Sequence, residues 1–173
     1  MKKFELTANT RMRFGKKLFQ IRALVSFEDV NVGDLGGYIE KDANLDHFGN
    51  AWVYGDAEVY GNAEVYGNAR VCGDAEVYGN ARVYGDARVC DNARVCGDAD
   101  YMIIGPIGSR NGITTFYRRR DGVTMVVCGC FHGTIDDFEK EITETHGDNV
   151  HATAYRAAAR LARIRVNTEP TQY

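Results

Sequence analysis

The sequence predicts a mainly β protein built on a parallel β-solenoid, with an N-terminal β-hairpin and a C-terminal α+β segment. The first observation is a hexapeptide repeat that runs in unbroken register from Ala51 to Asp100. The second is the alternation of small or apolar residues with polar ones inside each repeat. The third is that the residues on either side follow different patterns. Repetition at a short fixed period indicates a solenoid, and a period of six fits a triangular coil of three hexads.

One hexad, residues 57–62, shows how each side of the coil is expected to form. Ala57 and Val59 stand two positions apart, so they face the interior of a short strand. Glu58 and Tyr60 then face outward. The glycine and asparagine that follow tolerate left-handed backbone angles and therefore supply the corner.

Every third hexad is expected to stack on the same side of the coil, so the outward residues form columns. Neighbouring rungs lie about 4.8 Å apart, which places Tyr60 on Tyr78. The same stacking brings Glu64 to Arg82, and such cross-rung pairs stabilise a sheet. The predicted columns are Trp52/Tyr54, Arg70/Cys72 and Arg88/Cys90; Glu58/Tyr60, Glu76/Tyr78 and Arg94/Cys96; and Glu64/Tyr66, Arg82/Tyr84 and Asp100/Met102.

The chain is expected to divide into a hairpin cap over residues 1–36, a solenoid over residues 37–104 and a C-terminal domain. Residues 10–24 alternate around Gly15-Lys16, which indicates a hairpin that covers the open end of the solenoid. The weak early repeat is interrupted by His47-Phe48, and these two extra residues predict a bulge at one corner.

Residues 105–173 are predicted to form a ββαα domain that caps the other end. Strands on either side of Asp121-Gly122 form its hairpin. Thr134 is expected to begin a helix that ends before Gly147, with Asp137 in the first turn as the capping partner of Thr134. The buried face of this helix is expected to be Ile135, Phe138 and Ile142.

A second helix is expected to follow, with Asp148 as its N-cap. Its apolar residues recur at helical spacing and are predicted to form its buried face. These residues are Val150, Ala154, Ala157, Leu161 and Ile164.

Composition excludes several classes of protein. The hydrophobic content of 45% excludes disorder, and no apolar run approaches the roughly 20 residues that span a membrane. The N-terminus lacks the apolar segment of a signal peptide. Net charge is −3, with −7 concentrated in residues 39–105, so general binding to nucleic acid is not expected.

Five cysteines are present, an odd number. Cys72 and Cys90 are expected on consecutive rungs, at a Cα separation that a disulfide tolerates. Exposed thiols nevertheless fit a reducing compartment better than a secreted protein. The sequence therefore predicts a cytoplasmic location.

The glycine-rich loop 105–112 and the second helix carry candidate ligand-binding residues. Glycines, hydroxyls and an arginine in one loop can hold an anion through backbone amides and a guanidinium, although an ordinary connecting loop has the same composition. The helix arginines recur on one face, where they are either solvated or directed at an acidic ligand or partner. The candidates are Ser109, Arg110, Asn111, Thr114, Thr115, Arg156, Arg160 and Arg163.

A metal site is an alternative use of the C-terminal domain. Cysteine and histidine are zinc ligands, but a single residue between two cysteines is not the usual spacing. The alternative ligands are Cys128, Cys130, His132 and His146. No cofactor is expected.

The hexads resemble the left-handed β-helix of the hexapeptide acyltransferases, which implies that hand for the solenoid. In that family a histidine on or beside a coil is the general base toward an acyl-CoA substrate. Residues 51–100 contain no histidine, and His47 alone lies near the coils. The resemblance therefore implies the fold, and catalysis by His47 is an alternative.

Longer motifs resemble a group of bacteriophage and prophage hexapeptide-repeat proteins. They include residues 17–24, 33–41, 104–110 and 128–134 together with the Tyr-Gly-Asn/Asp-Ala repeats. This resemblance implies a viral origin and this architecture. Small accessory phage proteins often act against host immunity, so we expect a protein of the host cytoplasm that binds a host protein or a small anionic ligand. An anti-defence role is expected, with sequestration of a nucleotide-like signal or blockade of a defence protein; a structural spike module is a further alternative. A homotrimer is expected, packed through the tyrosine columns Tyr60/Tyr78 and Tyr66/Tyr84.

Overall fold

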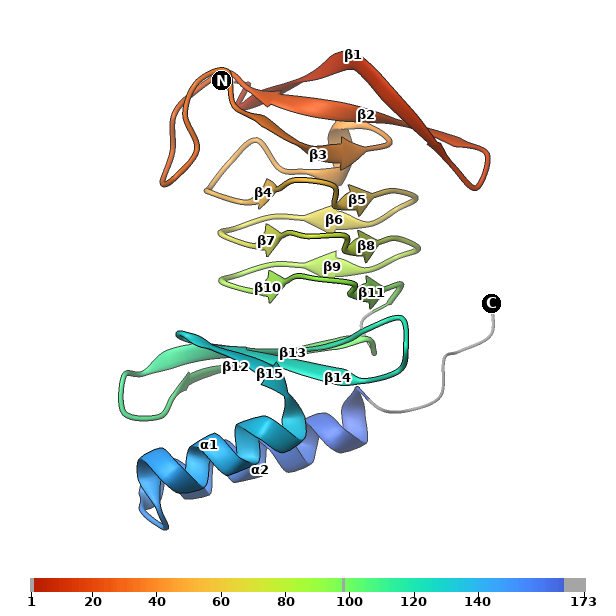
Figure 1. Ribbon diagram of the computed structural model, residues 1–173. Helices are drawn as coiled ribbons and strands as arrows, with labels where there is room; N and C mark the ends of the chain where they lie inside the picture. The colour runs from red at the N-terminus through yellow and green to blue at the C-terminus, as the bar shows by residue number, and fades with distance from the viewer. Residues whose placement is uncertain (1, 98, 167–173) are drawn as a thin grey trace. The chain divides into compact units, whose positions relative to one another are not determined.

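The computed structural model describes residues 2–97 and 99–166, and the chain divides into two compact units (Figure 1). Unit 1 comprises residues 1–98 and unit 2 comprises residues 99–173, so the final residues of the expected C-terminal domain, 167–173, lie outside the described part. The chain is mainly β, as predicted, and the two α-helices both belong to unit 2. Neither helix has the length and apolar content that crossing a bilayer requires, among the residues described.

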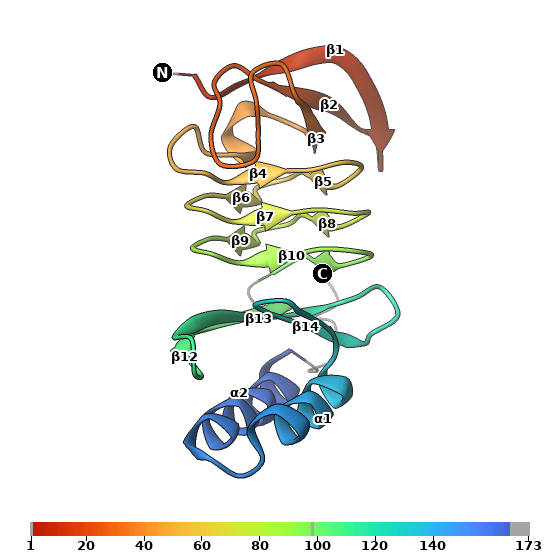
Figure 2. The same cartoon turned by 60° about the vertical axis from the view of Figure 1, so that its left-hand side comes forward.

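The hexads of unit 1 form a parallel β-solenoid, which confirms the predicted fold class. Each hexad contributes a two-residue strand, and strands three hexads apart pair in parallel (Figure 2). The three ladders are β4 (Trp52–Val53), β7 (Arg70–Val71) and β10 (Arg88–Val89); β5 (Glu58–Val59), β8 (Glu76–Val77) and β11 (Arg94–Val95); and β6 (Glu64–Val65) and β9 (Arg82–Val83).

Alanine and valine fill the interior of the solenoid. From Ala51 to Val95, every alanine and valine of the hexads is at most 1% exposed. The corners require a left-handed backbone: Gly79 has φ of +66°, and a Cβ on it would lie 2.4 Å from the carbonyl oxygen of Cys96. The pattern of small residues inside and glycine at corners is therefore a steric requirement of closely stacked coils.

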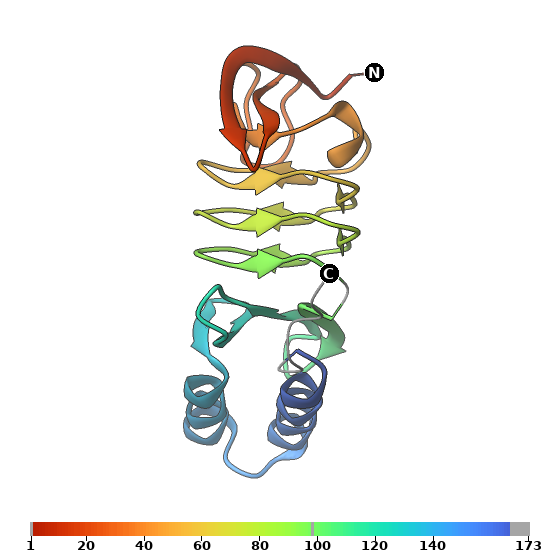
Figure 3. The same cartoon turned by 90° about the vertical axis from the view of Figure 1, so that its right-hand side faces the viewer.

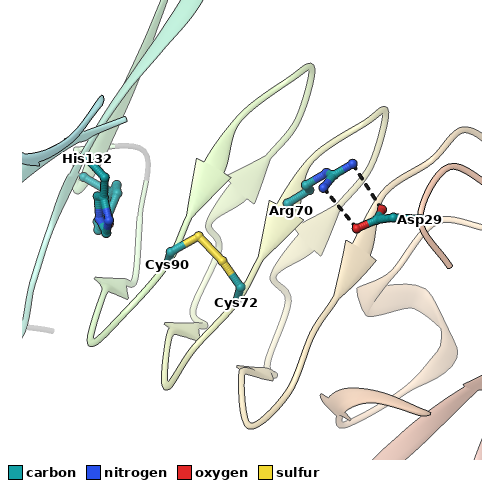
Figure 4. The surroundings of a disulfide bond; sticks show 6 residues. Asp29, Arg70, Cys72, Cys90 and His132 are labelled. Atoms are coloured by element: carbon teal, nitrogen blue, oxygen red, sulfur yellow. Dashed lines mark hydrogen bonds and ion pairs between the residues drawn. A yellow bond between two sulfur atoms is a disulfide. The ribbon is translucent and has the colours of Figure 1, made fainter. Parts of the chain in front are cut away.

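Side chains on the outer columns contact their neighbours one rung away, as expected. The Tyr60 and Tyr78 rings stack with centroids 5.1 Å apart. Arg82 lies 3.4 Å from the carboxylate of Glu64. Cys72 and Cys90, whose Cα atoms are 4.5 Å apart, are joined by a disulfide (Figure 4), although the sequence interpretation favoured free thiols.

The predicted N-terminal hairpin is present and extends the second ladder. Strands β1 (Phe4–Arg13) and β2 (Lys16–Ala23) are antiparallel, and β2 pairs with β3 (Leu35–Ile39). β3 in turn pairs in parallel with β5. The hairpin thus covers the edge that the first coil would otherwise expose, which is the usual requirement at the end of a solenoid.

The hairpin also covers the outer side of the second ladder, and this corrects the predicted exposure of that column. Arg11 contacts Asp56 at 2.6 Å and Glu58 at 3.2 Å, and Arg13 contacts both Glu58 and Glu76. Glu76 and Tyr60 are 3% and 5% exposed. These residues face outward from the coil as predicted, but a second layer of protein covers them.

Unit 2 contains a four-stranded antiparallel sheet where the sequence predicts two strands. Its order is β12 (Tyr101–Ile107), β13 (Gly112–Arg118), β14 (Thr124–Cys128) and β15 (Phe131–Thr134). Met102 pairs with Phe116 of β13. The predicted placement of Asp100 and Met102 in a third solenoid column is therefore wrong, because the chain leaves the hexad register before β12.

Helices α1 (Ile135–His146) and α2 (Val150–Arg165) lie side by side on one side of this sheet (Figure 3). Thr134 accepts a hydrogen bond from the Asp137 amide, and Gly147 ends α1 with φ of +56°, as predicted. The cap of α2 is Asn149, whose side chain accepts from the amides of His151 and Ala152. The prediction of Asp148 as that cap is wrong by one residue.

The predicted buried face of α2 is also wrong. Val150, Leu161 and Ile164 are 74%, 49% and 67% exposed. The helix instead buries alanines, whose small side chains permit a close approach, together with one aromatic ring and the residue after its last turn. The buried residues are Ala152, Tyr155, Ala158, Ala159, Ala162 and Val166.

Candidate functional site

The three helix arginines named from the sequence line one groove between α1 and α2. This groove has a volume of about 350 Å³, and Glu139 and Thr143 of α1 complete its lining. We call it the arginine groove. Helical spacing places the three arginines on one side of α2, and the packing of α2 against α1 gives that side a facing wall.

Arg156 stabilises the connection between the two helices. Its guanidinium donates to the Asp148 carboxylate at 2.9 Å, to the Gly147 carbonyl at 2.8 Å and to the Thr143 hydroxyl at 3.2 Å. The Gly147 carbonyl lies at the end of α1, where main-chain oxygens lack helical partners. Arg156 therefore has a structural role that also fixes the position of its guanidinium at the groove.

Arg163 is ion-paired with α1. Its Nη2 atom lies 2.5 Å from Asp136 and 2.9 Å from Glu139. These hydrogen bonds, that of Asp136 first, raise the pKa of Arg163. The charge of Arg163 is thus largely neutralised within the protein.

Arg160 differs from its two neighbours. Its side chain is exposed and, among the described residues, has no hydrogen bond or ion pair. It stands between two guanidiniums that are held in place by other contacts. Arg160 is therefore the group of the groove that is available to an anion.

The loop candidates Ser109, Arg110 and Asn111 lie at the exposed turn between β12 and β13. The turn packs on α2, because a Cβ on Gly108 would lie 1.8 Å from the hydroxyl oxygen of Tyr155. Burial raises the pKa of Tyr155 to about 12, and the charge of Arg110 opposes this rise. Arg110 thus lies near α2, but it is not part of the lining of the arginine groove.

Thr114 and Thr115 do not belong to the exposed surface of this loop. They are 0% and 2% exposed within β13. The Thr114 hydroxyl donates to the Cys128 sulfur at 3.2 Å. The prediction that they contact a ligand is inconsistent with this burial. The two threonines belong to β13, which follows the loop, and not to the exposed turn itself.

The alternative metal ligands are not brought together. Cys128 accepts from Thr114, His132 shares a 2.9 Å hydrogen bond with Tyr117, and His146 stacks on Tyr155. Cys130 is exposed on the turn between β14 and β15. In the part of the chain that the structure describes, His, Cys, Asp and Glu form no group of three or more that could hold a metal ion.

His47 lies in unit 1 beside the short 3₁₀-helix η1 (Asp42–Asn44). Its Nδ1 atom accepts the main-chain N–H of Lys3 at 3.1 Å, and its Nε2 atom lies 2.9 Å from Asp42. The ring also stacks on Phe4. Because Nδ1 accepts a hydrogen bond from the Lys3 amide, the proton of the neutral ring belongs on Nε2. The Nδ1 lone pair, which a general base would use, is therefore already engaged.

One groove adjoins this histidine. It has a volume of about 400 Å³, and its polar lining comes from Asp42, Asp46, His47, Glu64 and Tyr66. The three carboxylates give it a negative character. This groove does not suit the phosphate groups of an acyl-CoA, which carry the same sign of charge.

The comparison with known families concerns the solenoid. Residues 75–91 match a family model described as the YdcK β-solenoid repeat. This segment includes β8, β9 and β10, which amount to about one coil, and the match agrees with the repeat seen in the structure. No curated protein was found to match the chain.

Sequence reasoning missed two charged sites in unit 1. One is the contact of Arg11 and Arg13 with Glu58 and Glu76. The other is Lys3, which is 3% exposed and donates to the carbonyls of Gly49 and Ala51. The sequence did carry a signal for these contacts: residues 1–38 have a net positive charge and the solenoid that follows has a net negative charge.

Proposed function

We propose that this protein is a non-catalytic binding protein whose arginine groove holds an anionic ligand or an acidic segment of a partner protein. The observation that carries the proposal is Arg160, an exposed guanidinium with no partner in the described part of the chain, in a groove that contains two further arginines. The solenoid of unit 1 then has an architectural role.

The neighbours of Arg160 favour a ligand with several negatively charged oxygen atoms. Arg156 and Arg163 are held by Asp148, Asp136 and Glu139, so each has only part of its hydrogen-bonding capacity left. A phosphate or carboxylate that binds Arg160 would share these guanidiniums with the internal carboxylates. A charged hydrogen bond of this kind contributes about 1.5–3 kcal/mol.

The geometry at His47 supports binding over catalysis. The alternative function, acyl transfer with His47 as base, requires a free imidazole lone pair, and the Lys3 amide occupies it. We therefore place acyl transfer second. A structural spike module is the third candidate.

The biological setting follows from the resemblance to phage and prophage hexapeptide-repeat proteins. In that setting the protein acts in the host cytoplasm as an anti-defence protein. A nucleotide-like signal supplies the phosphates that the arginine groove favours, and an acidic surface of a defence protein supplies carboxylates. Association into a homotrimer through the remaining tyrosine column, Tyr66/Tyr84, belongs to this proposal.

Isothermal titration calorimetry with pyrophosphate and with ATP, at low salt and without divalent cations, tests the groove. We expect binding that weakens as salt is raised and that is reduced at least tenfold by Arg160→Ala, the equivalent of about 1.4 kcal/mol. Arg88→Ala on the solenoid is the matched control and should have little effect. Arg110→Ala tests whether the β12–β13 turn contributes.

Two results contradict the proposal. One is equal affinity of the wild type and Arg160→Ala for a ligand or host protein that Arg88→Ala fails to bind. The other is acetyl transfer from acetyl-CoA to an amine or hydroxyl acceptor that is lost in His47→Ala.

A further inference from the structure

Helix α2 carries an apolar stripe on the side opposite its buried face. The stripe consists of Val150, Ala154, Ala157, Leu161 and Ile164, which follow one another at alternating spacings of four and three residues. Such spacing forms a continuous seam along one side of a helix. Its three large members are between 49% and 74% exposed.

The stripe is confined to α2. The exposed residues of the neighbouring helix α1 are polar or charged. They include Asp136, Asp137, Lys140, Glu141 and Glu144. A narrow apolar ridge bordered by charges fits another helix better than it fits a broad apolar surface.

We propose that the apolar stripe is the contact between two copies of this chain, which pair α2 with α2 in antiparallel orientation about a twofold axis at Ala157. This surface is separate from the arginine groove, and the pairing does not depend on a ligand. An interface about a twofold axis must be complementary to itself. The sequence of α2 meets this requirement in size and in charge.

The sizes of the side chains are complementary in this register. Val150 lies opposite Ile164 of the second copy, and Ala154 lies opposite Leu161 of the second copy. Ala157 meets its own counterpart at the axis, where a small residue lets the two helices approach closely. Ile164 and Leu161 therefore each pack against a smaller residue of the second copy.

The charges select the antiparallel orientation. At the C-terminal end of α2, Arg165 lies opposite Asp148 of the second copy, whose side chain is 95% exposed. Asp148 already accepts from Arg156, and a carboxylate has room for a second donor. A parallel pair would instead place Arg165 against its own counterpart.

Light scattering and sedimentation equilibrium from 1 to 100 µM test the interface. We expect Leu161→Glu and Ile164→Glu each to halve the mass of the assembly, with the dissociation constant of the twofold contact raised at least a hundredfold and the helical circular dichroism unchanged. Phe48→Glu is the matched control, because Phe48 is 75% exposed in unit 1. A monomer throughout this range overturns the proposal, as does an assembly whose mass is unchanged in both stripe variants or is halved in Phe48→Glu.

Disulfide cross-linking tests the register without reliance on stability. In a background with Cys130→Ser, Ala157→Cys should form a cross-linked dimer in high yield, since the two copies of this residue meet at the axis. Ala154→Cys should cross-link poorly, because its counterpart is displaced by about 9 Å along the helix. Equal yields from the two variants would indicate a parallel pair and overturn the antiparallel arrangement.

A charge exchange gives an independent check. Asp148→Arg and Arg165→Asp should each weaken the dimer, and the double variant should recover at least part of the loss. Recovery is expected only if the two residues meet across the interface. Additive losses in the double variant overturn the assigned contact.

Discussion

At the scale of single residues, Lys3 is a buried cation held by main-chain oxygens. Its ammonium donates to Ala51 at 2.8 Å and to Gly49 at 3.3 Å, and it lies 5.3 Å from the centroid of the Phe27 ring. Burial lowers the pKa of Lys3 to about 8, although the charge of Asp46 opposes this change. The folded protein therefore favours the neutral amine more than the unfolded chain does.

The pH dependence of stability follows from this difference. Between pH 8 and 10.5 the unfolded chain binds more protons than the folded one at Lys3, so the free energy of unfolding rises with pH. We expect a rise of about 1–2 kcal/mol between pH 8 and 9.5. Above pH 10 Tyr54, whose pKa burial raises to about 12, contributes in the opposite direction.

Urea unfolding at half-unit steps of pH checks this prediction. Lys3→Met should lose the rise, whereas Lys2→Met, at a side chain that is 68% exposed, should keep it. A rise of equal size in Lys3→Met would assign it to another group.

At the scale of elements, the N-terminal hairpin is attached to the solenoid by a buried cluster of charges. β5 and β8 place Glu58 and Glu76 opposite each other in register, with side chains 9% and 4% exposed. Two adjacent carboxylates repel one another unless a cation compensates them. Arg13 of β1 contacts both.

We therefore expect Arg13→Met to destabilise unit 1 by about 3–5 kcal/mol, since it leaves two buried carboxylates without their shared partner. Urea unfolding followed by Trp52 fluorescence measures this loss. Adding Glu76→Gln should recover at least about 1 kcal/mol.

The control lies in the same hairpin. Arg22 pairs with Glu5 at a site where the side chains are 51% and 38% exposed. Arg22→Met should cost less than about 1 kcal/mol. Similar losses for the two arginine variants would show that burial of the Arg13 cluster is unimportant for stability.

At the scale of the whole molecule, the two units carry separate spectroscopic probes. Trp52, the single tryptophan, is buried in unit 1 at 1% exposure. The signal at 222 nm comes mainly from α1 and α2 in unit 2. Each unit has its own core, so we expect the two probes to report separate transitions.

Val83→Asp tests this separation. It places a charge in the dry interior of the solenoid, at a position with 0% exposure, and should cost several kcal/mol. The midpoint of Trp52 fluorescence should fall, while the midpoint at 222 nm should stay constant. Tyr84→Asp, one residue later and 46% exposed, is the control and should change neither midpoint by much.

Coincident shifts of both probes would mean that the units unfold as one. Equal effects of the two substitutions would mean that the inward and outward positions of the hexad have been exchanged.

The repeating part of the fold was predictable from the sequence, because successive hexads show the same alternation of inward and outward residues. Ala57 and Val59 point inward for a reason that is visible within one hexad. The burial of Tyr60 was not predictable in this way, since it depends on a hairpin that lies about 40 residues away in the chain. The same limit applies to Thr114, which a neighbouring strand covers.

The two faces of α2 show a second limit. The helix has an aliphatic stripe on one side and an alanine-rich face with Tyr155 on the other. The aliphatic stripe was predicted to be buried because its side chains are larger. Close packing selected the second, because small side chains fit against α1 and the sheet while Tyr155 fills the space over Gly108. The arginines of the groove were identified correctly as a set, but only the structure distinguishes Arg160 from its ion-paired neighbours.

The disulfide links residues 18 positions apart, which is the length of one complete coil. A coil inserted after β8 would have the same interior of alanine and valine, so we expect the lengthened chain to fold. A loss is different. Deletion of one coil that begins at Glu76 would bring Arg94 to the place beneath Arg13, where two guanidiniums would meet in place of an ion pair. The contact of Arg13 with Glu76 therefore makes the removal of this coil more costly to unit 1 than the insertion of another.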